Sequence, residues 1–120
     1  MKGVLSIYLQ SAVLVRDVKK IGKMSVFVTF EHDTLTHTSP ICHGEGKKPS
    51  WEDCQFDFTI YENDDTIQMI VCSKNLLHIK EIGRSLIWVE SLLEAGGADW
   101  DWWEDVGYDG KIVGQVHLRS

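Results

Sequence analysis

The stretch DCQFDFTI, residues 53–60, alternates apolar and polar side chains at every position. The apolar positions all have the same parity, and they are Cys54, Phe56, Phe58 and Ile60. Successive side chains of a β-strand point to opposite faces of its sheet. The pattern therefore predicts a strand with one face in the core and the other in water.

Four other segments share this period of two: residues 3–10, 23–31, 66–72 and 111–119. The last of them predicts burial of Ile112, Gly114, Val116 and Leu118. Turn-forming residues such as Ser39-Pro40 and Asp109-Gly110 separate the runs. Short strands at regular spacing predict an antiparallel β-sandwich or barrel.

The segment 75–93 leaves two interpretations open, because its apolar residues also fall at helical spacing. A helix over about 75–93 is an alternative to a further strand. The short run ESLLE, residues 90–94, favours a helical turn that ends at Gly96 and Gly97.

Length and composition predict a single domain, since 120 residues with 43% hydrophobic side chains suffice for one core. No apolar run approaches the roughly 20 residues of a membrane span, so we expect any membrane contact to be peripheral. Three cysteines without a CxxC pair indicate a reducing compartment, and we predict a cytoplasmic location. The net charge of -6 argues against nucleic acid as a partner.

Taken in order along the chain, the landmarks resemble those of a C2 domain. GVLSIYLQSAVLVRD, residues 3–17, resembles the opening strand with its loop aspartate, and KKPSWEDCQFDF, residues 47–58, resembles the Asn-Pro-x-Trp segment before a Phe-x-Phe strand. IQMIVCSKN, EIGRSLIWVESLL and GKIVGQVHLRS follow in the family's order.

The resemblance implies an all-β fold, an eight-stranded antiparallel Greek-key β-sandwich that spans residues 1–120. Because the chain opens on the Gly-x-Leu strand, the resemblance also implies the circularly permuted, type II topology. Such domains usually belong to longer proteins, so we expect an amino-terminal module. Two departures stand out: Lys48 replaces the usual asparagine, and Trp51 lies five residues before Phe56, which predicts a β-bulge.

The family holds calcium through loop aspartates, and a calcium ion takes about six to eight oxygen ligands. The resemblance places the ligand positions at Asp17, Ser73, Asn75 and Lys80. Asp17 alone keeps a carboxylate, and a lysine occupies one of the other places. We therefore predict a domain that works without calcium and uses no cofactor.

Positive and apolar residues stand in the loops where the metal ligands are missing. The proposed lipid-binding residues are Lys19, Lys20, Ile21, Lys23, Lys47, Lys48, Lys74, Leu76, Leu77 and Lys80. A lysine near an anionic membrane contributes on the order of 1 kcal/mol and a buried leucine roughly 1.5 kcal/mol. This favours docking to anionic phospholipid. The alternative is that the apolar loop residues fold back on the core and the lysines are merely solvated.

A second function class is a protein-interaction scaffold without lipid binding. Its candidate surface holds Trp100, Trp102 and Trp103 among acids that would attract a basic partner. The resemblance instead places one or two of these tryptophans in a strand as part of the core.

Enzymatic and metal-binding patterns find no support in the sequence. There is no Gly-x-Ser-x-Gly elbow and no phosphate-cradling glycine loop. Zinc would need ligands at set spacings, and those of the cysteines and histidines match no known pattern. We predict a non-catalytic module with a lipid or protein partner and no small-molecule substrate.

Overall fold

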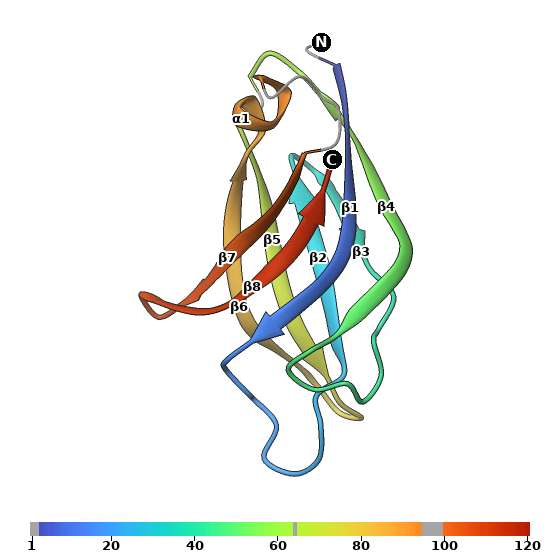
Figure 1. Cartoon of the computed structure of the whole chain (residues 1–120), viewed down its shortest axis with the longest axis vertical. Helices are drawn as coiled ribbons and strands as arrows, with labels where there is room; N and C mark the ends of the chain where they lie inside the picture. Colours follow the sequence, from blue (N-terminus) through green and yellow to red (C-terminus); the bar gives the residue numbers. More distant parts are fainter. Residues whose placement is uncertain (1–2, 64, 95–99) are drawn as a thin grey trace.

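The computed structural model describes residues 3–63, 65–94 and 100–120. These residues form eight strands and one short helix (Figure 1). Their bounds are β1 (Gly3–Leu14), β2 (Val26–His32), β3 (Leu35–Thr38), β4 (Ser50–Ile60), β5 (Thr66–Lys74), β6 (Ile79–Trp88), α1 (Val89–Glu94), β7 (Asp101–Tyr108) and β8 (Lys111–Arg119).

The strands form two antiparallel layers of four, in the orders β3-β2-β5-β6 and β7-β8-β1-β4. A single residue pair, Arg84 with Gly107, joins β6 to β7 and so connects the layers. β1 pairs with β4 although β2 and β3 lie in the other layer. The predicted eight-stranded antiparallel sandwich is confirmed, with β1 between β8 and β4.

The core lies between the two layers, and the period of two places its residues correctly in most strands. Phe30, Phe58 and Ile60 are buried, and Phe56 packs on Phe30 with a centroid distance of 5.1 Å. The predicted burial of Ile112 is wrong, because this side chain is 66% exposed. It lies at the start of β8, in the β7–β8 hairpin, where the opposite layer no longer covers the strand.

The predicted bulge lies in β4. Trp51 and Cys54 are both buried although two exposed residues separate them. The second of those residues, Asp53, has a φ of 49°, and the β1–β4 register shifts between Leu9 and Ser11. From Leu9 to Ser11 β1 advances two residues while β4 spans four, from Cys54 to Ser50, so β4 carries extra residues at this irregularity.

The helix considered for residues 75–93 is wrong over most of its length. β6 occupies Ile79–Trp88, because β5 offers it an extended antiparallel partner. Strand register also explains why Ile87 is buried while Leu86 is exposed. The helical turn at residues 90–94 is confirmed within α1, and its predicted end at Gly96 and Gly97 lies outside the described residues.

Gly83 allows the two layers to meet at the β6–β7 seam. A Cβ at this position would lie 2.6 Å from Val106 Cγ1 and 2.8 Å from the Gly107 carbonyl oxygen. Such distances are shorter than non-bonded contacts allow, so only glycine permits this approach without a shift of β7.

Three connections lie together at one end of the 46 Å long molecule, the lower end in Figure 1. They are the β1–β2 loop (15–25), the β3–β4 loop (39–49) and the β5–β6 loop (75–78). Within the described ranges, no helix has the length and hydrophobicity needed to cross a membrane.

Candidate functional site

Backbone hydrogen bonds tie the three loops into one surface, which we call the loop end. Lys74 N donates to Ser25 O at 2.9 Å, which joins the start of the β5–β6 loop to the β1–β2 loop. Gly46 N donates to Met24 O at 3.0 Å, and Leu14 N donates to Lys47 O at 2.8 Å. The β3–β4 loop is thereby fixed against both ends of the β1–β2 loop.

Lysines dominate the charge of the loop end. Seven of the chain's 12 Lys and Arg residues are exposed there or directly beside it: Lys19, Lys20, Lys23, Lys47, Lys48, Lys74 and Lys80. They come from the β1–β2 and β3–β4 loops and from the ends of β5 and β6 that adjoin the third loop. The structure thus brings together every lysine that the sequence singled out.

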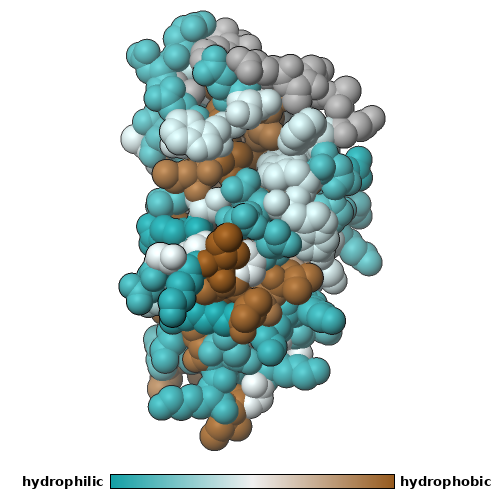
Figure 2. Space-filling view, turned by 60° about the vertical axis from the view of Figure 1, so that its left-hand side comes forward, coloured by the Kyte–Doolittle hydropathy of each residue, from teal (hydrophilic) through white to brown (hydrophobic). Residues whose placement is uncertain are grey.

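Apolar side chains protrude from the same surface. The exposed fraction is 84% for Ile21, 102% for Leu76 and 90% for Leu77, so these three do not fold back on the core. Val18 does pack against the core. Figure 2 shows an apolar group at the lowest point of the molecule, with hydrophilic side chains around it.

An open cleft of about 680 Å³ lies between the loops. Its lining residues are Lys19, Ser25, Ile41, His43, Lys74, Asn75, Leu76, Leu77 and His78. Within this described lining there is no carboxylate, so its only formal charges are positive. His43 and His78 were not predicted from the sequence, because they are 35 positions apart and match no motif; only their place in two of the loops connects them.

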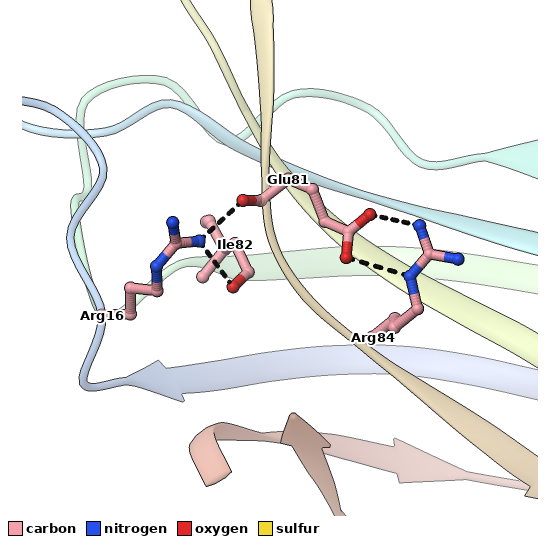
Figure 3. Close-up of polar contacts among 4 residues, drawn as sticks. All are labelled: Arg16, Glu81, Ile82 and Arg84. Carbon is pink, nitrogen blue, oxygen red and sulfur yellow. Dashed lines mark hydrogen bonds and ion pairs between the residues drawn. The ribbon is translucent and has the colours of Figure 1, made fainter. Parts of the chain in front are cut away.

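Arg16 anchors the β1–β2 loop to the opposite layer (Figure 3). Its Nη1 donates to the carbonyl oxygens of Glu81 at 2.8 Å and of Ile82 at 2.9 Å. The same guanidinium lies 3.7 Å from the ring centroid of Tyr108, a cation–π contact. These contacts hold the start of the loop against β6.

Glu81 uses its side chain differently, in a paired contact with the Arg84 guanidinium that Figure 3 also shows. The hydrogen bonds from Arg84 hold the pKa of the Glu81 carboxyl below its ordinary value. Its negative charge is therefore balanced on β6, and Glu81 is not among the residues that line the cleft.

The three candidate tryptophans do not form one surface. Trp102 packs against the core, and its Nε1 donates to Glu104 at 2.9 Å. Trp100 and Trp103 are 44% and 46% exposed. Trp103 stacks on His117 at a centroid distance of 4.8 Å.

No family model matches the sequence. No curated protein matches it either. Solved structures do match: a C2 domain-containing protein from a putative elicitor-responsive gene has a TM-score of 0.80 and 22% identity, over 98% of this chain and 85% of that one. A C2 domain of plant Extended Synaptotagmin 1 has a TM-score of 0.81 and 12% identity, over 98% and 91%. The chain has the C2 fold.

A third structure, the two calcium-bound C2 domains of Extended-Synaptotagmin 2, has a TM-score of 0.82 and 18% identity. The match covers 98% of this chain and 44% of that two-domain structure. This chain therefore spans less than half of that structure's length.

The positions predicted to correspond to C2 calcium ligands have other roles in this chain. Asp17 Oδ1 accepts from Lys19 N at 2.9 Å and shapes its own loop. Asn75 Oδ1 accepts from the backbone N–H groups of Leu77 and His78 at 3.1 and 3.0 Å. Ser73 is buried at the end of β5, where it pairs with Lys80 of β6. Across the described residues, no three His, Cys, Asp or Glu side chains form a group that could hold a metal ion.

Proposed function

We propose that this chain is a non-catalytic module that docks on anionic phospholipid membranes through its loop end and does so without calcium. One observation carries the proposal: seven exposed lysines and three protruding apolar side chains share one surface. Apolar tips surrounded by cations suit the boundary between acyl chains and phosphate groups.

Magnitudes support binding by this surface. Each lysine near an anionic bilayer contributes on the order of 1 kcal/mol. Each buried leucine or isoleucine adds roughly 1.5 kcal/mol or more. Ile21 belongs to the β1–β2 loop and Leu76 and Leu77 to the β5–β6 loop, so both loops would enter the interface together.

Net charge supports a defined orientation on the membrane. The chain carries -6 overall although its loop end is basic, so the rest of its surface is strongly acidic. An anionic membrane attracts the loop end and repels the other faces. The attraction decreases over about 8 Å at physiological ionic strength, which makes salt sensitivity an expected property.

Independence from calcium is supported by the donor set in the loops. Of the predicted ligand positions, Asp17 alone has a carboxylate, and one of its oxygens already accepts a backbone hydrogen bond. Lys80 places a positive charge at another position. Calcium sites rely on several carboxylates to offset the ion's charge.

A binding role without catalysis is supported by the cleft chemistry. The hydroxyl group in the described lining belongs to Ser25, and its Oγ accepts from Gly44 N at 3.1 Å. A nucleophilic serine needs a base that a third group orients, and within the described lining there is no carboxylate to serve as that third group.

Co-sedimentation with vesicles tests the proposal. Vesicles of phosphatidylcholine with phosphatidylserine should bind the native chain equally in calcium and in chelator. The variant Lys19→Glu/Lys20→Glu/Lys23→Glu should lose binding. Binding that requires calcium, or no binding in either buffer, would contradict the proposal.

A charge-matched pair controls for net charge. Lys20→Glu and Lys111→Glu change the net charge equally, but Lys111 lies in the β7–β8 hairpin, away from the loop end. Lys20→Glu should weaken vesicle binding several-fold more than Lys111→Glu. Equal weakening would indicate general charge attraction without a docking surface.

A protein partner is the second candidate, favoured by the two exposed tryptophans. Trp100 precedes Asp101 and Trp103 precedes Glu104, and such aromatic residues among acids suit a basic peptide. Trp103→Ala should leave vesicle binding unchanged if the loop end alone docks. Loss of vesicle binding in this variant would place the contact on β7 instead.

A further inference from the structure

We infer that the cleft at the loop end is a proton-sensitive binding site for a phosphomonoester headgroup of a membrane lipid. The inference rests on the proposed function and adds the class of ligand and its regulation by pH. It begins from the four basic side chains that line the cleft: Lys19, His43, Lys74 and His78.

These four side chains surround the cleft from separate segments. Lys19 comes from the β1–β2 loop, His43 from the β3–β4 loop, Lys74 from the end of β5 and His78 from the β5–β6 loop. The volume of about 680 Å³ falls within the range of small-ligand sites, roughly 300–1,000 Å³. The site therefore suits a compact anion that accepts hydrogen bonds on several sides.

A phosphomonoester fits this charge better than a phosphodiester. It carries a charge of about -1.5 to -2 near pH 7 and has three free acceptor oxygens. A phosphodiester headgroup carries a single phosphate charge. Two lysines, with no carboxylate in the described lining, favour the ligand with the larger charge.

The position of the cleft favours a ligand presented by a membrane. Leu76 and Leu77 line the cleft and are also among the most exposed apolar side chains of the described residues. When both leucines enter the bilayer interface, the cleft lies at headgroup level. A lipid can then place its phosphate in the cleft while its acyl chains stay in the membrane.

A hydrogen bond with Asn75 orients the His78 ring in this structure. Asn75 Oδ1 accepts from two backbone N–H groups, so its Nδ2 must be the atom that faces His78. Nδ2 lies 3.3 Å from His78 Nε2 and is a donor. In this arrangement Nε2 is the acceptor of the hydrogen bond.

Protonation of His78 would place two donors opposite each other and break this hydrogen bond. The ring would then need another acceptor, and a phosphate in the cleft supplies one. Histidine is the side chain that changes charge between pH 5 and 8. Anion binding and proton uptake are thus coupled, and each favours the other.

Charges around the histidines strengthen the coupling. Lys19 and Lys74 line the same cleft as the two histidines. The acids on the adjoining loop segments are Asp17 and Glu45, and neither lines the cleft. A bound phosphate reverses the local potential, so His43 and His78 gain protons on binding.

The experiment compares two pH values and two lipids. Vesicles of phosphatidylcholine with phosphatidic acid present a phosphomonoester, and vesicles with phosphatidylserine adjusted to equal surface charge present a phosphodiester. The native chain should bind the phosphatidic acid vesicles at least threefold more tightly at pH 6.5 than at pH 7.6, since one charge near the surface is worth about fivefold. Phosphatidylserine vesicles should bind more weakly at both pH values.

Histidine variants test whether His43 and His78 cause the pH dependence of vesicle binding. His43→Gln/His78→Gln should bind with an affinity ratio near one between the two pH values, and both side chains are exposed, so the variant should fold. The control His117→Gln, on β8, should retain the native ratio. Inorganic phosphate at millimolar concentration should not displace the chain from the vesicles.

Each contrary outcome has a distinct meaning. Vesicle binding with no pH dependence in the native chain, or with equal dependence in the double variant, overturns this inference and leaves the proposed function standing. Equal affinity for the two lipids overturns the preference for a phosphomonoester. Displacement by inorganic phosphate overturns the claim that the ligand is a membrane lipid. No vesicle binding at either pH overturns the proposed function as well.

Discussion

The sequence indicated two candidate binding surfaces, the lysine-rich loop end and the tryptophans of β7, and the two differ in how many of their side chains are exposed. At the loop end, seven lysines and three apolar side chains are exposed together. In β7, Trp102 turns into the core while Trp103 faces outward. Strand parity separates neighbours to opposite faces, whereas loops follow no such period.

Residues that are adjacent in sequence form one exposed surface only where the backbone conformation leaves all of their side chains in solvent. Leu76 and Leu77 are adjacent and both exposed, because the β5–β6 loop turns on hydrogen bonds to Asn75. Trp102 and Trp103 are adjacent in a strand, so their side chains point to opposite faces of the sheet and only one of them faces solvent. Substitutions in β7 should therefore lower the stability of the fold, whereas substitutions at the loop end should lower vesicle binding.

Trp102→Ala should have the largest effect on stability. Trp102 packs against the core and its Nε1 donates to Glu104, so we expect a loss of about 3 kcal/mol. Trp103→Ala, on the outer face, should cost less than about 1 kcal/mol. Urea unfolding of both variants measures the difference, and equal costs would mean that parity does not separate their roles.

The fold was predictable because burial in a two-layer sandwich follows a period of two. Cys54, Phe58 and Ile60 show this, and even the bulge followed from the spacing of Trp51 and Phe56. Residues 75–93 were ambiguous because their apolar residues satisfy both periods. Pairing with β5, a contact that no local pattern specifies, decided in favour of the strand.

Leu76→Ser should lower vesicle affinity about tenfold, because transfer of one leucine into an apolar environment is worth roughly 1.5 kcal/mol. Its stability should change by less than about 0.5 kcal/mol, since the side chain is exposed. Quantitative vesicle binding and urea unfolding measure the two effects.

Leu35→Ser is the matched control, since Leu35 is also exposed but lies at the β2–β3 turn, away from the loop end in Figure 1. It should bind vesicles like the native chain. If the two serine variants weaken binding equally, the loop end is not the apolar contact.

The site was only partly predictable. The lysines and leucines could be found because they lie close together in short stretches of the sequence. Arg16 and the two cleft histidines could not, because their roles arise from contacts with β6 or from a cleft between loops. Such contacts depend on the three-dimensional path of the chain, which no local pattern encodes.

Arg16→Lys should lower stability less than Trp102→Ala does. A lysine keeps the charge but loses the planar group that contacts two carbonyl oxygens and the Tyr108 ring. We expect a destabilisation of about 1 kcal/mol and faster amide hydrogen exchange in residues 17–25. Vesicle affinity should decrease by less than about fivefold, because the loop must then be ordered on binding.

Hydrogen exchange provides the decisive readout for Arg16. Exchange that accelerates in β7 but not in the β1–β2 loop would show that Arg16 serves the Tyr108 contact alone. Lys111→Arg, a conservative change in the β7–β8 hairpin, should leave exchange in both regions unchanged.

The smallest effect is expected at Glu81, which balances charge on β6 beside the Arg16 anchor. Hydrogen bonds from Arg84 lower the pKa of the Glu81 carboxyl from its ordinary 4.5, so the folded state favours the ionised form. This contribution is present above the unfolded-state pKa and is lost as pH falls through the lower folded-state value. The pair is partly exposed, so it should be worth less than about 1 kcal/mol.

Glu81→Gln should therefore be slightly less stable than the native chain above about pH 5, and the two should converge as the pH falls below about 4. Urea unfolding across this range, with Arg84→Gln and the double variant to complete a cycle, measures the coupling. A difference that stays constant as the pH falls through this range would assign the effect to packing. The backbone carbonyl of Glu81 still accepts from Arg16 in the glutamine variant, so vesicle binding at neutral pH should not change.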